Sequence, residues 1–544
     1  MASVIPSTPH WPTGTLLAFS HLDGPTDFAN GLVARAVPGG IDVRIPDLQK
    51  IRFFFPGENI RQVHITSDWF EISDGSKPVC RGVMLDAWHL LVEGPCTTTA
   101  PSDRIRIHVT NSLPARLLVG SAGHFNPELI HTDIDDAVAA RRRWLNTQAA
   151  NIGKNLPSGT RATLLRALSQ MKGQACSPEG ILQHPWTTPD RWPHRDIWLW
   201  DSVFHAAGWR HLDARLAAQM IEAVLDLQSP DGFIPHHATP WKHSRITQPP
   251  VLALGVELVW EKTGDLEWLD RLFPKIAACL EWNARNRDTD GDGLLEWHID
   301  AMPDSRSGES GMDNSPRFDE ATLLGAPDFN AYQASEYECL SRFAKKLGRD
   351  TEAAHWAARH AELCARINRK LWSEAHGFYC DWNPSTNALS DVLACSGFLP
   401  LICGAPDARM AARLATHLGN PATFGTAFPV ASVAVSDTAR FSKDMWRGPA
   451  WISTNWLIAR GFRRYGLHAT ADRLVQASLR KLERTVTRWG TFFEYFDSKA
   501  EIEPPFLLRK RKNIPGTFPH QAIEDFGWSA TLYADWIFSG NNAS

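Results

Sequence analysis

Two carboxylates in unlike surroundings are the residues of this chain best suited to acid–base chemistry. Asp313 lies in Gly308–Asp319, where glycines and a proline oppose a regular helix and favour a shaped loop. Glu494 lies in Thr491–Asp497, among aromatic rings that disfavour its charged form. Two acids whose environments differ in this way are typical of a general acid and a general base.

Tryptophan is unusually abundant, with 23 residues against 6 tyrosines. Indole offers a flat apolar face and one hydrogen-bond donor, which suits the C–H face of a sugar ring. A single tryptophan is more often a core residue. Many of these, however, lie beside polar residues and near the candidate motifs, namely Trp192, Trp198, Trp200, Trp241, Trp297, Trp446 and Trp451.

Two further segments place polar and aromatic side chains on one helix face. Trp198, Asp201 and His205 are spaced by three and four residues, so they face the same way on a helix. Helix capping is an alternative role for Asp201. Trp451 and Asn455 are four residues apart at the start of another predicted helix. These residues are candidate substrate contacts.

The overall composition limits the classes of partner. The 544 residues carry a formal net charge of −4, which argues against nucleic acid and favours a small-molecule ligand. Nine cysteines without CxxC pairs indicate reduced thiols, and no signal peptide or membrane-spanning run is evident, so we expect a cytoplasmic protein. The sequence predicts no cofactor and no metal in the site, and it leaves the oligomeric state open.

The acidic run Asp288–Gly293 begins like a calcium-binding loop. Ile299 stands at the twelfth position, where such a loop needs a bidentate glutamate. We therefore expect a tight polar turn, with calcium binding as the alternative.

The order of predicted elements indicates a mainly α protein preceded by a β-sandwich. Residues 1–130 contain short apolar runs separated by turn residues, residues 131–158 have the composition of a helical linker, and residues 159–544 show apolar spacings of three and four. The predicted strands are Thr15–Ser20, Gly31–Ala36, Ile41–Ile45, Ile51–Phe55, Gln62–Thr66, Val79–Leu85 and Ile105–Val109. About twelve predicted helices, joined by long connections rich in Trp and Gly, fit an (α/α)₆ barrel with a functional loop face.

Four motifs in sequence order resemble those of glycoside hydrolase family 63 and its trehalase-like relatives. They are Trp200–His205, Gly311–Arg317, Trp446–Trp451 and Phe493–Tyr495. The resemblance covers roughly residues 160 to 540 and implies an inverting α-glycosidase on an (α/α)₆ barrel. It further implies Asp313 as general acid and Glu494 as general base, with the cleaved sugar held by Asp201, Trp200, Arg317, Arg447 and Trp451.

The protonation states required by these roles lead to two further expectations. Asp313 must carry a proton, and Glu309 is a nearby like charge that would favour the neutral form. Glu494 must stay ionised among its aromatic neighbours, which calls for a cation such as Arg447.

Ser498–His520 departs from the resemblance, which implies a short Gly-rich turn after Glu494. It contains the basic run Arg509-Lys510-Arg511-Lys512. We expect this insertion to border the entrance of the site, where the basic run would meet an anionic leaving group or simply face solvent.

The leading hypothesis is thus an inverting, exo-acting α-glucosidase that hydrolyses a short α-glucoside or a glucosylated small molecule. The alternatives are an α-mannosidase-type or α-L-rhamnosidase-like hydrolase, and a carbohydrate-binding protein without catalytic activity.

Overall fold

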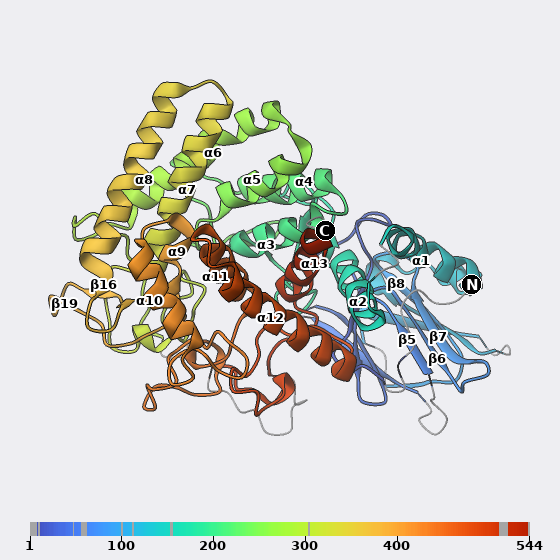
Figure 1. Ribbon diagram of the computed structural model, residues 1–544. Helices are drawn as coiled ribbons and strands as arrows, with labels where there is room; N and C mark the ends of the chain where they lie inside the picture. The colour runs from blue at the N-terminus through green and yellow to red at the C-terminus, as the bar shows by residue number, and fades with distance from the viewer. Residues whose placement is uncertain are drawn as a thin grey trace. The chain divides into compact units, whose positions relative to one another are not determined.

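The structure is a computed structural model that describes residues 8, 11–46, 48–55, 62–99, 102–110, 114–152, 156–302, 305–510 and 521–541. The chain divides into two compact units (Figure 1). Unit 1 comprises Met1–Ile197, Leu482–Phe492 and Glu524–Ser544, and unit 2 comprises Trp198–Lys481 and Phe493–Ile523. The predicted domain boundaries at residues 130 and 158 stay predictions.

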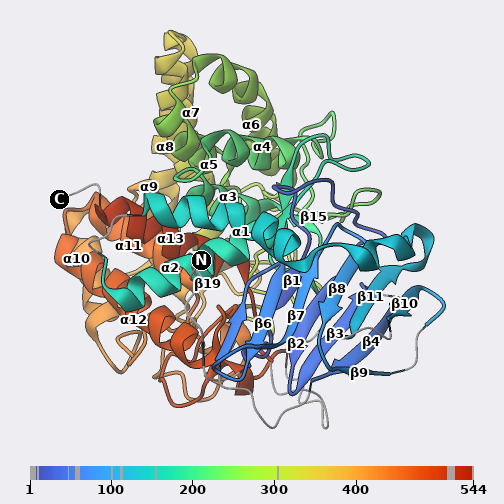
Figure 2. The same ribbon diagram turned by 90° about the vertical axis from the view of Figure 1, so that its right-hand side faces the viewer.

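Two antiparallel sheets form the N-terminal part of unit 1 (Figure 2). The first has the order β1-β2-β3-β4-β9 and the second the order β10-β11-β8-β7-β6-β5. Their strands are β1 (Leu16–Ala18), β2 (Val33–Val37), β3 (Gly40–Ile45), β4 (Gln49–Phe54), β5 (Gln62–Ile65), β6 (Trp69–Ser73), β7 (Pro78–Met84), β8 (His89–Glu93), β9 (Thr97–Thr98), β10 (Ile105–Val109) and β11 (Arg116–Ser121). Side chains of both sheets share one apolar core that includes Ile41 and Phe53 from the first and Phe70 and Leu90 from the second. This arrangement agrees with the predicted sandwich.

Helices complete unit 1. They are α1 (Ile134–Asn151), α2 (Ser158–Gln174) and α13 (Gly527–Asn541), of which α2 and α13 pack against each other. Helix α1 lies within the predicted linker. The two-residue strands β12 (Ala175–Cys176) and β13 (Trp186–Thr187) pair with each other.

Helices are the main regular elements of unit 2, and long loops connect them. Its helices are α3 (Leu199–Trp209), α4 (Ala214–Leu225), α5 (Leu252–Thr263), α6 (Leu266–Asn286), α7 (Pro327–Lys346), α8 (Asp350–Leu371), α9 (Pro400–Cys403), α10 (Ala408–Gly419), α11 (Ile452–Arg464) and α12 (His468–Trp489), the last of which runs on into unit 1 in sequence. Its short strands are β15 (His237–Ala238), β16 (Trp372–Ser373), β17 (Phe378–Tyr379), β18 (Trp382–Asn383) and β19 (Ala388–Leu389), while β14 (Ile197–Trp198) lies at the unit boundary.

The helices of unit 2 pack in consecutive pairs, α3 with α4, α5 with α6 and α7 with α8 (Figure 1). The alternate helices α3, α5, α7, α9 and α11 also contact one another in series. Aspartates fix several starts: Asp213, Asp265 and Asp407 cap α4, α6 and α10 by accepting a backbone N–H of the first turn.

The apolar pattern of the sequence also predicts a helix over Val392–Leu401, and this prediction is wrong. Val392–Leu401 forms a 3₁₀ turn (Cys395–Phe398) followed by the single-turn helix α9, because Pro400 lacks the N–H that a continuing helix would need. Within the described ranges, no helix is long and apolar enough to cross a membrane.

Three of the four candidate motifs lie at or before the starts of α3, α7 and α11, and the fourth, which contains Glu494, follows α12. Trp200 and Asp201 lie in the first turn of α3, the Asp313 loop comes before α7, and Trp451 directly precedes α11. The starts of three alternate helices and the segment after α12 are therefore the elements that position the candidate site.

Candidate active site

Asp313 lies in a tightly folded loop, as its glycines and proline predicted. Backbone hydrogen bonds from Gly311 to Gly308 and from Ser315 to Met312 close successive turns. Gly311 has φ +70°, in the left-handed region, and a Cβ there would lie 2.5 Å from the indole of Trp200. Only glycine fits this close approach, so the loop packs directly on the start of α3.

Glu494 is almost fully enclosed, with an exposed fraction of 4%. Its backbone N–H donates to the carbonyl of Ile523, and its neighbour Tyr495 packs on Trp451 at a ring separation of 4.9 Å. The carboxylate is paired with the guanidinium of Arg509 at 2.6 Å. A cation thus faces Glu494 inside its aromatic surroundings.

Arg509 and Lys510 bring the two candidate acids together. While Arg509 pairs with Glu494, the ammonium of the adjacent Lys510 lies 2.7 Å from the carboxylate of Asp313. Two acids that are far apart in the sequence therefore contact neighbouring residues of one segment. The two-carboxylate hypothesis requires the two acids to lie near each other, and their contacts with adjacent residues agree with this requirement.

The segment that ends at Lys510 is anchored by its backbone. Leu508 donates its N–H to the carbonyl of Lys443 at 3.0 Å, and its own carbonyl accepts the Tyr495 hydroxyl at 2.6 Å. The N–H of Lys510 donates to the Asp444 carboxylate at 2.8 Å. We call residues 507–510 the basic segment; its Leu508 forms an isolated β-bridge with Asp444, in the turn that precedes α11.

Both candidate acids favour the charged form of Arg509. Burial by itself would lower its pKa, but Glu494, the Tyr495 hydroxyl and Asp313 act in the opposite direction and raise the pKa above its ordinary value. Arg509 therefore stays a cation in the folded protein.

Arg447 and Glu309 do not play the electrostatic roles expected from the sequence. Arg447 makes a bidentate pair with Asp319, at 2.8 and 2.6 Å, and the cation on Glu494 is Arg509 instead. Glu309 is buried and paired with Arg287 at 2.6 Å, and it accepts the N–H of Thr247. Because Arg287 neutralises the Glu309 carboxylate, Glu309 does not act as an unpaired negative charge that would favour protonation of Asp313.

Of the predicted helix face, Asp201 and His205 lie on α3, whereas Trp198 lies in β14, directly before the helix. Trp200, Asp201 and His205 are all buried in this helix, and burial lowers the pKa of His205 to about 3, so this imidazole is neutral at ordinary pH. Trp198, which is partly exposed, stacks on His237 at a ring separation of 4.7 Å. The face offers indole rings, one acid and one neutral imidazole.

Arg317 is completely enclosed between two aspartates. Its guanidinium contacts Asp328 at 2.7 and 2.9 Å and Asp381 at 2.8 and 2.5 Å. Burial opposes the charge, but the two carboxylates raise the pKa well above its ordinary value. All three guanidinium nitrogens are already engaged, which favours a role in holding the Asp313 loop.

The candidate residues around α11 are held in fixed positions. Trp451 stacks face to face on Trp446 at 3.9 Å and donates its ring N–H to the carbonyl of Met445. Asn455 accepts the N–H of Val430 and donates to the carbonyl of Pro429 and to Ser478. The amide of Asn455 therefore shapes the chain at residues 429–430.

The acidic run at Asp288 is a polar turn, as expected. Asp288 accepts the N–H of Gly293, and Glu296 accepts both the N–H and the hydroxyl of Thr289. Single oxygens of Asp288, Asp290 and Glu296 lie within 4.8 Å of one another. Calcium binding stays an untested alternative.

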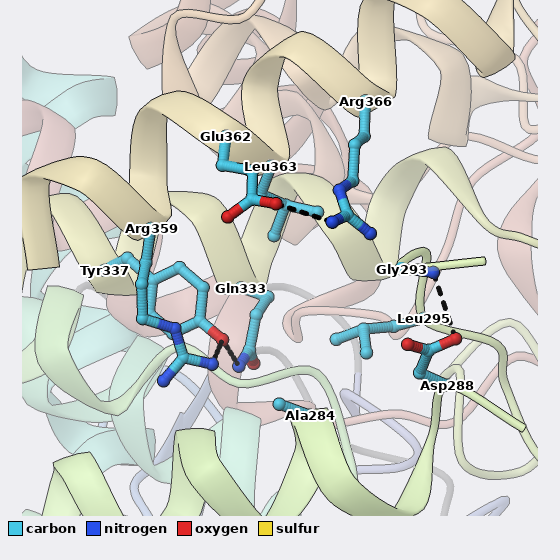
Figure 3. A pocket seen from close by; sticks show the side chains of 10 residues that line it. All are labelled: Ala284, Asp288, Gly293, Leu295, Gln333, Tyr337, Arg359, Glu362, Leu363 and Arg366. Atoms are coloured by element: carbon cyan, nitrogen blue, oxygen red, sulfur yellow. Dashed lines mark hydrogen bonds and ion pairs between the residues drawn. The ribbon is translucent and has the colours of Figure 1, made fainter. Parts of the chain in front are cut away.

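Asp288 also lines a cavity of about 170 Å³ (Figure 3). Its polar walls are largely bonded to one another: the Tyr337 hydroxyl contacts Gln333 and Arg359, and Glu362 pairs with Arg366. None of the candidate catalytic side chains lines this cavity.

Sequence reasoning missed the pairing of Arg509 and Lys510 with the two acids. The basic run was visible, and its position shortly after Glu494 was the available signal. Its first two residues do not simply face solvent, whereas Arg511 and Lys512 lie outside the described residues.

A family model described as "Mannosylglycerate hydrolase MGH1-like glycoside hydrolase domain" matches residues 193–529. The mannosylglycerate hydrolase of Thermus thermophilus is 28% identical over 420 residues, which cover 62% of this chain and 93% of that protein. A crystal structure of a GH63 mannosylglycerate hydrolase from Thermus thermophilus in complex with glucose has a TM-score of 0.56 at 28% identity, covering 68% of this chain and 98% of that one. A bacterial glucoamylase structure has a TM-score of 0.62 over 98% of this chain and 95% of that chain, at 10% identity, and shows similarity of fold alone.

Proposed function

Because the chain belongs to the MGH1-like family of glycoside hydrolases related to GH63, we propose that it is an inverting, exo-acting α-glycosidase with Asp313 as general acid and Glu494 as general base. The observation that carries this proposal is the contact of both acids with the adjacent residues Arg509 and Lys510. Family membership makes the chain an enzyme, which removes the alternative of a binding protein without activity.

The helix contacts support an (α/α)₆ barrel as the scaffold of this site. In such a barrel, alternate helices form the inner ring and their partners form the outer ring. The series α3, α5, α7, α9 and α11, with α4, α6 and α8 beside their sequence neighbours, follows this pattern in unit 2. The loops at the starts of the inner helices then surround the substrate.

The proposed mechanism assigns opposite proton transfers to the two acids. Asp313 donates a proton to the glycosidic oxygen as that oxygen leaves the anomeric carbon. Glu494 accepts a proton from a water molecule that attacks the same carbon from the opposite face, which inverts its configuration. Arg509 stabilises Glu494 as the carboxylate, the form that a base must have.

We assign the remaining candidates to two tasks. The proposed contacts of the cleaved sugar are Trp198, Trp200, Asp201, His205 and Trp451, because indole faces and a carboxylate suit the C–H and O–H groups of a sugar. Arg317, Arg447 and Asn455 are proposed to act mainly by positioning, since their polar groups bind other parts of the protein.

The substrate is proposed to be a short α-glycoside with glucose as the leading sugar. An α-mannosidase-type activity is the second candidate, because the family model and the Thermus thermophilus relative carry the name of mannosylglycerate hydrolases. Parallel assays of α-glucosyl and α-mannosyl derivatives of glycerol, of glycerate and of a second sugar would decide between them.

The catalytic assignment is tested by Asp313→Asn and Glu494→Gln. Each is expected to lower kcat by at least about a hundredfold, the lower range of acid–base contributions, without lowering the unfolding temperature greatly. Glu374→Gln, at an exposed site, is the control for a lost carboxylate. Proton NMR of the fresh product should show the β-anomer of the released sugar. Near-normal activity in either variant, or release of the α-anomer, would contradict the proposal.

A further inference from the structure

We propose that Lys510 is an exchangeable counter-ion that holds Asp313 as a carboxylate until an anionic group in the leaving-group region takes the ammonium away. Asp313 can then take up a proton from solvent and act as the acid. This inference rests on the proposed function and adds a form of regulation to it: small carboxylates, which match the carboxylate that they replace as partner of Lys510, should activate hydrolysis of neutral glycosides.

The ion pair and the catalytic role require different forms of Asp313. The contact of 2.7 Å with an ammonium is an ion pair of the carboxylate, whereas a general acid must be the carboxylic acid. After exchange, the proton taken from solvent passes to the glycosidic oxygen as its bond to the anomeric carbon breaks, and Glu494 takes a proton from the attacking water. The charges balance in this sequence because the anion replaces Asp313 as the partner of Lys510.

The two ion pairs of the basic segment differ in how easily the cation can leave its carboxylate partner. The side chains of Lys510 and Asp313 are 26% and 23% exposed, so both ends of that pair reach solvent, whereas the side chain of Glu494 is only 6% exposed. A lysine ammonium is a compact charge on a flexible stem, while the planar guanidinium of arginine is more rigid. Lys510 is therefore the mobile cation and Arg509 the fixed one.

The backbone of Lys510 is held while its side chain remains able to turn. Its N–H is anchored on the buried Asp444 at 2.8 Å, and its φ of +53° lies in the left-handed region that a lysine rarely adopts. This backbone conformation aims the side chain towards Asp313. Exchange of the ammonium between Asp313 and a ligand then needs only side-chain rotation.

The test measures hydrolysis of a neutral α-glycosyl glycerol with added sodium acetate, at constant ionic strength set with potassium chloride. Acetate should raise kcat of the natural protein about fivefold, the factor that corresponds to an exposed ion pair of about 1 kcal/mol. Acetamide, which is neutral, should have no effect. The matching α-glycosyl fluoride needs little help from an acid, so its hydrolysis should respond much less to acetate.

Lys510→Met should hydrolyse the neutral glycoside faster than the natural protein without acetate and should lose the activation. Lys510→Gln serves as a second variant if the first folds poorly, and Lys499→Met is the control for loss of another lysine from Ser498–His520. Inhibition or no change by acetate in the natural protein, or activation that persists in both Lys510 variants, would overturn the inference. Loss of activity in Asp313→Asn combined with no acetate effect would remove this inference alone, whereas full activity in Asp313→Asn would remove the proposed function.

Discussion

Arg447 and Asp319 form a bidentate ion pair that joins the loop after Asp313 to the turn before α11. Two bonds of Asn314 strengthen the same connection, because its side-chain oxygen accepts the N–H of Trp446 and its carbonyl accepts from Arg447. The residue directly after the proposed acid is thereby fixed against the stacked indoles of Trp446 and Trp451. We therefore propose that Arg447 positions Asp313, the proposed acid, whereas the cation that pairs with Glu494 is Arg509.

Arg447→Lys should lower kcat about ten- to a hundredfold with a smaller change in KM, because lysine cannot form the bidentate contact and the acid loop shifts. Arg440→Lys, at an exposed pair with Asp437 and Asp391, is the control and should stay close to the natural rate. The double variant Arg447→Lys with Asp319→Asn should have a kcat little below that of either single variant, since both substitutions break the same ion pair. Fully additive losses would show that Arg447 acts in another way.

Gly311→Ala should impair both stability and activity. The left-handed φ of +70° costs about 1–3 kcal/mol for a residue with a side chain, and the added Cβ meets the indole of Trp200. Gly308→Ala is a matched control in the same loop, because its Cβ would be 3.5 Å from Ile246 without a left-handed φ. Urea unfolding and steady-state rates measure the two effects, and equal behaviour of the two variants would contradict this account.

The sequence predicted most elements of the fold where the apolar pattern was clear. Seven predicted strands correspond to β1, β2, β3, β4, β5, β7 and β10, while β6, β8, β9 and β11 were missed. Every residue of β8 is buried, so this strand lacks the alternation that marks a strand with one face in solvent. The sequence predicts a helix over Thr351–Trp372, and α8 spans Asp350–Leu371, because an apolar face that repeats over several turns marks a long helix clearly.

Local sequence motifs predicted the parts of the candidate site that consist of residues close together in the sequence. The loop of Asp313 and the α3 face are local features, and spacing and glycine content revealed them. The pairing of Lys510 with Asp313 joins residues almost two hundred positions apart, and a charge run by itself usually faces solvent. The partners of Arg317 were missed for the same reason, since Asp328 and Asp381 belong to other segments.

Arg317→Met should destabilise the protein by about 3–5 kcal/mol, because it leaves Asp328 and Asp381 buried without their cation. Arg413→Met removes an exposed pair with Glu374 and is expected to cost at most about 1 kcal/mol. Urea unfolding at neutral pH compares the two. A similar small loss in both variants would mean that the two aspartates find other partners or take up protons at little cost.

Glu296 should make stability fall as the pH rises from about 5 to 8. Burial, followed by the charges of Asp290 and Asp288, raises the pKa of Glu296 from its ordinary value of 4.5 to about 7, despite the opposing hydrogen bonds from Thr289. The folded state therefore binds the proton more tightly than the unfolded state does, so this contribution is complete below about pH 4.5 and is lost as the pH passes through 7.

Glu296→Gln keeps an oxygen for the Thr289 donors but removes the titration, so its unfolding free energy should change less between pH 5 and 8 than that of the natural protein. Glu374→Gln is the control, because the pKa of Glu374 is lowered to about 2 by Arg409 and this exposed group does not titrate in that range. The unfolding free energies of each variant and of the natural protein are measured by urea unfolding at half-unit pH steps. Their difference isolates the contribution of the substituted glutamate from that of the histidines, which titrate in the same range. Parallel curves for Glu296→Gln and the natural protein would contradict the raised pKa of Glu296 in the folded state.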